Sequence, residues 1–169
     1  MPAMSPEKGA LNLLQNCAGA KRGDRLLIAC EPPEHGYFDA DAVDVICRAA
    51  RAYGLSVDCV DVGFNPGDPH LTPELLERMA AADIILFLSR LGDQLRFSQM
   101  PKGKTIVVSF AQSQAQLGSG FANAHHGAFL ALKDAVNAAF DRAETLRITC
   151  PLGTDITGRP EMDLTPDGD

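Results

Sequence analysis

The chain has 169 residues, and its 22 acidic residues against 15 basic ones give a formal charge of -7. This length suits one domain, which buries roughly 70% of its extended-chain surface and needs neither a disulfide nor a metal to fold. A content of 46% hydrophobic and 22% charged residues excludes a disordered chain, and the acidic balance argues against nucleic acid as a partner, because nucleic-acid binders present clustered Lys and Arg to phosphates.

The first half of the chain alternates predicted helices with predicted strands. Ser5 and Pro6 begin the first helix, because serine caps a helix N-terminus and proline fits the first helical position. A Lys-Arg-Gly-Asp turn then leads into an apolar strand at residues 26–30. After a Pro-Pro loop, a second helix runs to Gly54, and residues 57–62 form the second strand. The apolar helical faces are formed by Leu11, Leu14 and Cys17, and by Val43, Ile46, Cys47 and Ala50.

The second half continues this alternation. Thr72 and Pro73 begin a third helix, and apolar strands follow at residues 84–88 and 105–110. A longer amphipathic helix then leads to a fifth strand at residues 146–150. The two helical faces are formed by Leu75, Leu76 and Met79, and by Phe129, Leu132, Val136, Ala139 and Phe140.

Strands that are apolar throughout and separated by helices are typical of a parallel sheet that is covered on both faces. We therefore expect an α/β fold: a three-layer, doubly wound domain with a mostly parallel five-stranded sheet, Rossmann-like but without a dinucleotide fingerprint. Residues 1–150 are expected to form this single domain. Residues 150–169 carry five acidic residues and one basic residue, so residues 151–169 are expected to be an acidic tail or the start of a linker.

The chain shows no targeting signal. Residues 1–6 lack the basic region and apolar core of a signal peptide, and apolar runs such as residues 84–88 are too short to cross a bilayer. The five cysteines are odd in number and form no C-x-x-C pair, which indicates neither a zinc ribbon nor a thioredoxin-like site. We therefore expect a cytoplasmic protein with reduced cysteines and without a membrane partner.

In a doubly wound sheet, ligands bind at the carboxyl ends of the strands. The segment after the first strand contains Glu31, Pro32, Pro33 and Glu34 where a dinucleotide fold needs G-x-G-x-x-G. Prolines lack the N–H groups that approach a pyrophosphate, and carboxylates repel it, so this segment argues against a nucleotide site. The chain also lacks the sequence G-x-x-x-x-G-K-[ST], which excludes a P-loop.

Four histidine and cysteine side chains are candidate metal ligands or nucleophiles. His125 and His126 are expected at the N-terminus of the long helix rather than on a metal, because the side chains of adjacent residues diverge. Cys30 and Cys150 each end a predicted strand and so border the expected crevice. We expect packing roles for both, since neither has a histidine nearby in sequence that would activate a thiol.

Arg90 and Arg96 flank the loop after the third strand. They either hold an anionic group or are solvated, and solvation is the favoured interpretation. These residues do not complete a catalytic arrangement, so the sequence assigns no catalytic, cofactor-binding or metal-binding residue.

Two motifs near the ends of the chain carry a family resemblance. The first is Lys-Arg-Gly-Asp-Arg-Leu-Leu-Ile at residues 21–28, after a helix, and the second is Arg-Ile-Thr-Cys-Pro-Leu-Gly-Thr-Asp-Ile-Thr at residues 147–157. They resemble the motifs K-x-G-[DE]-x-[VL]-x-I and R-[IV]-T-x-P-x-G-T-D-[LI]-T, with which the N-terminal domain begins and ends in the thermophilic metallo-aminopeptidase family (leucyl aminopeptidase and aminopeptidase T). The most specific part of the resemblance consists of Gly153, Thr154 and Asp155.

The resemblance implies a metal-dependent hydrolase whose paired metal ions are held by a following C-terminal catalytic domain. This chain would supply non-catalytic walls of the substrate cleft and a subunit contact in a homodimer. The metal-ligand motifs of the family are absent here, so a divalent metal is implied only for a longer protein and no cofactor is expected on this chain. Two alternatives stay open: the same portion of an iron-dependent dihydroxypyridine ring-cleaving dioxygenase, which resembles the same family, and a stand-alone α/β binding or interaction module without catalysis.

Overall fold

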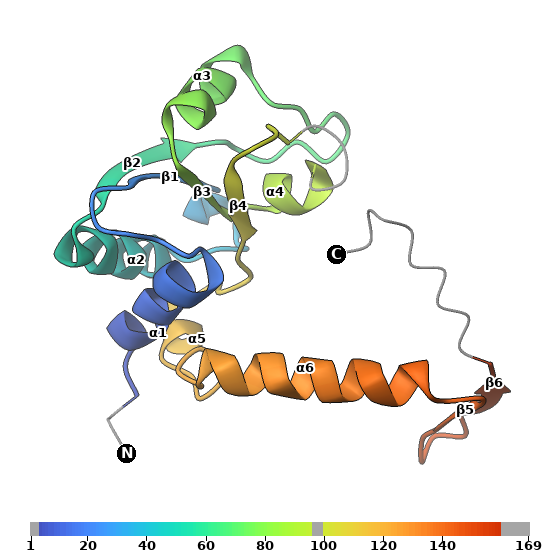
Figure 1. Ribbon diagram of the computed structural model, residues 1–169. Coiled ribbons are helices and arrows are strands. Elements are labelled where there is room, and N and C mark those ends of the chain that lie inside the picture. The colour runs from blue at the N-terminus through green and yellow to red at the C-terminus, as the bar shows by residue number, and fades with distance from the viewer. Residues whose placement is uncertain (1–3, 96–99, 160–169) are drawn as a thin grey trace. The chain divides into compact units, whose positions relative to one another are not determined.

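The computed structural model describes residues 4–95 and 100–159. The chain divides into two compact units, Met1–Ala124 and His125–Asp169, and each unit is described by itself. Figure 1 labels the helices and strands of both units.

The first unit is organised around a parallel sheet of four strands, in the order β2-β1-β3-β4. Its strands are β1 (Arg25–Cys30), β2 (Ser56–Asp61), β3 (Ile84–Leu88) and β4 (Thr105–Val108). Leu26 of β1 lies opposite Val57 of β2 on one side and Ile84 of β3 on the other. The chain starts in the middle of the sheet, adds β2 on one side and then β3 and β4 on the other. The strand order therefore reverses between β1 and β3, which creates a topological switch point.

Helices cover both faces of this sheet, in three layers (Figure 1). Leu26 and Ile28 face the buried cluster that contains residues of α1 (Pro6–Asn12), α2 (Ala40–Tyr53) and α5 (Gln114–Leu117). The alternate residues Leu27 and Ala29 face the cluster of α3 (Pro73–Ala81) and α4 (Arg90–Leu95). Because both of its faces are buried, the sheet is apolar at its centre, from Leu26 onward in β1 and at every position of β3, and the expected three-layer α/β fold is confirmed.

Local sequence signals explain where the helices of this unit begin and end. The hydroxyl of Ser5 accepts a hydrogen bond from the Lys8 amide at 3.1 Å, and that of Thr72 accepts one from the Leu75 amide at 3.2 Å. Gly54 ends α2 with a φ of 101°, a left-handed conformation that favours glycine. A π-helical turn at Leu13–Cys17 extends α1, and the loop after β1 contains a 3-10 turn at Pro33–His35.

The described residues of the second unit, up to residue 159, form one helix and one hairpin. The helix α6 spans His126–Asp141 and contains no buried residue. The strands β5 (Leu146–Thr149) and β6 (Asp155–Gly158) pair in antiparallel fashion, with Ile148 opposite Ile156.

The fifth predicted strand is thus present, but the expectation that it extends the parallel sheet is wrong. It pairs with β6, inside the segment that was expected to be a tail or linker. The physical reason is visible in its composition: Arg147 and Thr149 alternate with Leu146 and Ile148, whereas β3 is apolar at every position. Alternation of this kind suits a hairpin with one open face, and a continuous apolar run suits a covered parallel sheet.

Candidate functional site

The carboxyl edge of the sheet, at the switch point between β1 and β3, is the place where the fold predicts a ligand site. Glu31 follows β1 directly, and Ser89 and Arg90 follow β3. The amide of Glu31 donates to the carbonyl oxygen of Leu88 at 3.0 Å, so the chain segments that leave the two strands stay side by side beyond the strand ends.

An ion pair between Glu31 and Arg90 occupies this edge. The Glu31 side chain is fully buried, whereas the Arg90 side chain is 28% exposed. Nε of Arg90 donates to both carboxylate oxygens of Glu31 at 3.0 Å, and Nη2 donates to Oε1. The backbone amide of Arg90 donates to Oε2 at 3.1 Å. Glu31 therefore holds both the side chain of Arg90 and the first residue of α4.

Two aromatic rings complete the surroundings of Arg90. Its guanidinium carbon lies 3.4 Å from the centre of the Phe64 ring and 4.9 Å from the centre of the Tyr37 ring. Phe64 belongs to the loop after β2 and also meets the imidazole of His35 edge-on, at 6.4 Å between ring centres. The planar cation of Arg90 thus connects the segments that follow β1, β2 and β3, by ionic and cation–π contacts.

The pair determines the protonation state of the site. Burial raises the pKa of Glu31, but hydrogen bonds from the side chain and backbone of Arg90 outweigh burial, so the pKa of Glu31 lies below its usual value. The hydrogen bond to Glu31 also raises the pKa of Arg90 above its usual value. A carboxylate that is ionised and saturated with donors in this way is a poor proton acceptor. The arrangement fixes loops in place and does not resemble a general base.

Two buried serines lie at the same edge. Ser109 follows β4, and its hydroxyl accepts a hydrogen bond from the Ala111 amide at 3.2 Å. Ser89 is 1% exposed, and its hydroxyl has no hydrogen-bond partner among the residues that the structure describes. Among the described residues, no basic side chain hydrogen-bonds to either hydroxyl, so neither serine is an activated nucleophile in this geometry.

Arg90 departs from the sequence-based interpretation. Solvation was favoured for it, but the structure places it in an ion pair and against two rings. Sequence reasoning also missed Glu31 as its partner, although both residues directly follow apolar strands that are neighbours in the sheet. Arg96 lies outside the described residues.

The other candidate residues lie in different parts of the fold. Cys30 donates to the Val60 carbonyl oxygen at 3.4 Å and packs against the core, which confirms its packing role. His125 caps α6 and His126 begins it, as the sequence predicted. Cys150 is in the turn of the second unit's hairpin, and β5, the strand that it follows, is not a member of the parallel sheet. Its side chain is exposed, so the packing role expected for it is wrong.

The Gly-Thr-Asp motif shapes this hairpin turn. Gly153 has a φ of 103°, which only glycine adopts readily, and its amide donates to the Cys150 carbonyl oxygen at 3.1 Å. The Cys150 sulfur lies 3.1 Å from the Thr154 hydroxyl oxygen, and hydrogen bonds to this sulfur from Thr154 lower the pKa of Cys150. Asp155 receives two hydrogen bonds of 2.8 Å from Arg147, and this pairing lowers the pKa of Asp155. Among the described contacts, the motif has a structural role in the turn.

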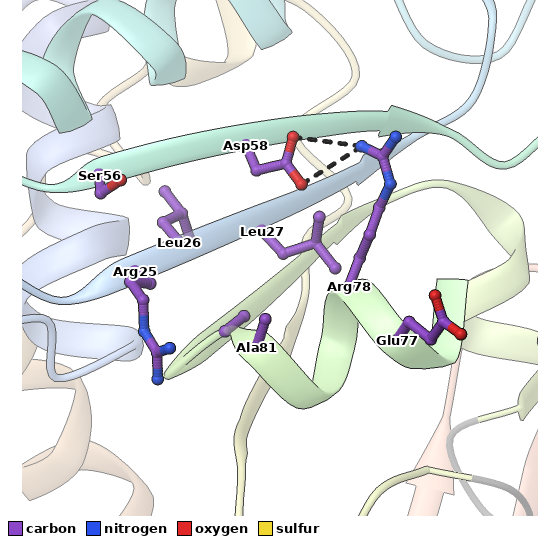
Figure 2. Close-up of a pocket in the computed structure, with 9 residues that line it drawn as sticks. Arg25, Leu26, Leu27, Ser56, Asp58, Glu77, Arg78 and Ala81 are labelled. Atoms are coloured by element: carbon purple, nitrogen blue, oxygen red, sulfur yellow. Dashed lines mark hydrogen bonds and ion pairs between the residues drawn. The ribbon is translucent and has the colours of Figure 1, made fainter. Parts of the chain in front are cut away.

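A separate hollow of about 350 Å³ lies toward the opposite end of the strands, between β1, β2 and α3 (Figure 2). Arg78 crosses it and donates to both carboxylate oxygens of Asp58, at 3.2 and 3.3 Å. Arg25 is likewise paired, with Asp83 at 2.7 Å, and this contact lowers the pKa of Asp83. Since both guanidinium groups are matched by carboxylates, the hollow offers little attraction to an anion.

The described residues contain no group of three or more His, Cys, Asp or Glu side chains placed to hold a metal ion. Within residues 4–95 and 100–159, no helix combines the length and the apolar character needed to cross a membrane. No protein-family model matches this chain, and a comparison with curated proteins gives no match either.

Proposed function

We propose that this chain is the non-catalytic α/β portion of a metal-dependent, leucyl aminopeptidase-like protein, in which it shapes the substrate cleft and makes a subunit contact. The observation that carries the proposal is the apolar surface of α6. Leu132 is 60% exposed, and Leu130, Val136 and Phe140 are exposed as well. A helix with this much apolar surface normally packs against other protein, and the proposal assigns that cover to the remainder of a longer enzyme.

The family named in the proposal rests on a motif in the β5–β6 hairpin, which follows α6 in the sequence. Gly153, Thr154 and Asp155 carry the resemblance to the aminopeptidases, and they form a tight turn that directs the chain out of β5. In the resembling family the chain passes from this motif into the metal-binding half.

The chemistry of the described residues favours a supporting role. They offer no set of ligands for the divalent metal ions of the family, so no catalytic step is assigned to this chain. The Glu31–Arg90 pair contributes by holding the segments after β1 and β3 in one fixed arrangement, as the wall of a cleft requires.

The first test is an activity assay with the 169-residue chain and leucine p-nitroanilide, with Co²⁺ or Zn²⁺ added, beside an established leucyl aminopeptidase as the positive control. We expect no metal-stimulated release of nitroaniline from the chain alone. Clear release would overturn its non-catalytic role.

The second test is the size and activity of the native polypeptide in its source cells, measured with an antibody against this chain and by intact mass. A polypeptide well above 18.0 kDa with metal-stimulated leucyl aminopeptidase activity is the expected result. Iron-dependent loss of dihydroxypyridine absorbance would instead identify a ring-cleaving oxygenase. A native product of 18.0 kDa would favour a stand-alone module, and either of these outcomes overturns the proposal.

A further inference from the structure

Two cysteines from different elements meet on the face of the sheet that α2 covers. Cys47 is a buried residue of α2, and Cys59 is an exposed residue of β2. Their sulfur atoms are 3.2 Å apart, in hydrogen-bond contact. Cys59 points toward α2 because residues two apart along a strand share a face, and Val57 packs against the same buried cluster. Because β2 is an edge strand, Cys59 stays accessible while its partner is enclosed.

The hydrogen bond from Cys47, supported by the cation of Arg51, favours ionisation of the exposed sulfur. Hydrogen bonding by Cys47 lowers the pKa of Cys59 to about 7, burial opposes this change, and the nearby cation of Arg51 supports it. Asp58 and Asp44 act in the other direction but do not cancel it. The same hydrogen bond, together with burial, raises the pKa of Cys47, so the enclosed sulfur keeps its proton and donates it to the Cys59 thiolate.

We propose that Cys59 and Cys47 form a dithiol modification site, at which Cys59 attacks a low-molecular-weight disulfide and Cys47 completes an intramolecular disulfide between β2 and α2. The co-reactant is a small disulfide such as glutathione disulfide.

The reaction balances in two exchange steps. First, the Cys59 thiolate attacks one sulfur of glutathione disulfide, whose S–S bond breaks, and a glutathione thiolate leaves. Second, the Cys47 thiol loses its proton and attacks the Cys59 sulfur, which breaks the mixed disulfide and releases a second glutathione thiolate. The two cysteines lose two protons and two electrons, and one glutathione disulfide becomes two glutathione molecules.

The geometry of the fold suits the second step. The two sulfur atoms need to approach from 3.2 Å to about 2.05 Å, the usual length of a disulfide bond. A third thiol, Cys30, lies near enough for the charge of Cys59 to raise its pKa further, after burial, and it donates to the Val60 carbonyl oxygen. We therefore expect Cys47, not Cys30, to resolve the mixed disulfide.

The test treats the reduced full chain with glutathione disulfide, blocks remaining thiols with N-ethylmaleimide at timed intervals, and maps cysteine peptides by mass spectrometry. The expected end product is a Cys47–Cys59 disulfide that lacks two hydrogens relative to the reduced protein. At pH 7 Cys59 should react roughly threefold or more faster than Cys17, since a larger thiolate fraction outweighs the lower nucleophilicity of a less basic thiolate. The rate at Cys59 should rise with a midpoint near pH 7.

Three variants distinguish the two roles. Cys47→Ser should stop at a stable glutathione adduct on Cys59, Cys59→Ser should leave Cys47 unmodified, and Cys17→Ser is the matched control that should behave as the wild type. A mixed disulfide that persists in the wild-type chain, a Cys30–Cys59 product, or faster reaction at Cys17 would each overturn the proposal. The wild-type peptide map needs no variant, so the test holds even if a serine at position 47 impairs folding.

Discussion

The two long helices, α2 in the first unit and α6 in the second, have similar lengths and opposite surroundings. Six of the 14 residues of α2 are buried, whereas none of the 16 residues of α6 is buried. Both sequences contain apolar residues at helical spacing. The comparison shows that the periodicity of apolar residues identifies the apolar face of a helix, but does not identify the protein surface against which that face packs. In α2 the cover is the parallel sheet of the same unit, whereas the described residues of the second unit bury no residue of α6. The proposed function assigns the cover of α6 to further protein.

The sharpest test of this comparison removes one large side chain from each unit. Phe87→Ala in β3 should lower the free energy of unfolding by about 3–5 kcal/mol, because Phe87 is completely buried and the substitution leaves a cavity. Phe140→Ala in α6 is the matched control, and its effect should stay within about 0.5 kcal/mol because Phe140 is 40% exposed. Urea unfolding monitored by circular dichroism measures both values. Equal losses would show that α6 is covered within this chain.

A second prediction concerns the pair at the switch point. Glu31→Ala removes the acceptor of the Arg90 side chain and of its backbone amide, and should lower the free energy of unfolding by about 2–3 kcal/mol. This is less than for a fully enclosed pair, because water reaches part of Arg90 and can replace the lost contacts. The measurement is urea unfolding at pH 7. A loss below about 0.5 kcal/mol would contradict the structural importance of the pair.

The same pair has a consequence for pH dependence. The pKa of Glu31 in the folded chain lies below the usual 4.5, so its stabilising effect is complete above pH 4.5 and is lost as the pH falls through the lower, folded value. Glu31→Gln should flatten this part of the profile of unfolding free energy against pH. An unchanged slope between wild type and variant below pH 4.5 would show that the carboxylate does not titrate as described.

A third prediction tests the packing of α1 on α5. A Cβ atom added to Gly9 would overlap the carbonyl oxygen of Leu117, which belongs to the backbone and has little room to move. Gly9→Ala should therefore lower the free energy of unfolding by about 1–2 kcal/mol, although alanine favours a helix. Gly118→Ala is the milder control, because its nearest neighbours are 3.4 Å away. Stabilisation by Gly9→Ala would contradict the close approach of the two helices.

The smallest effect on the chain itself is expected from Leu132→Glu on α6. Leu132 is 60% exposed, so the unfolding free energy of the 169-residue chain should change by less than about 0.5 kcal/mol. In the longer protein of the proposed function, the same substitution should disrupt assembly, which size-exclusion chromatography detects. Ala131→Glu is the control, because at 100° per residue Ala131 lies opposite the apolar stripe of α6. A marked loss of stability in the isolated chain would show that α6 is already covered.

Much of the first unit was predictable, because its signals are local. The buried strands are uninterrupted apolar runs, Ser5 and Thr72 cap their helices, and Gly54 ends α2. The pairing partner of the fifth strand could not be predicted from such local signals. Strand propensity does not specify the pairing partner, and the antiparallel pairing depends on the turn at Gly153.

The candidate site illustrates a second limit of sequence reasoning. Glu31 and Arg90 are 59 positions apart, and only the adjacency of β1 and β3 brings them together. The strand order was not predicted, so Arg90 was assigned to solvent. The meeting of Cys47 with Cys59 also depends on how α2 lies against the edge strand, which no spacing rule in the sequence expresses.

The contacts of Arg90 with the Phe64 and Tyr37 rings and with the Glu31 carboxylate make three loops interdependent. Loops of an α/β domain are usually exchangeable, and new binding specificities arise by replacing one while the others stay unchanged. Here, replacing the segment after β1 removes the Glu31 carboxylate that accepts from Arg90, and replacing the segment after β2 removes the Phe64 ring that contacts the Arg90 guanidinium. Even Arg90→Lys removes the planar guanidinium group, which binds the carboxylate of Glu31 and packs on the Phe64 ring. Redesign of this edge therefore has to replace the three segments together.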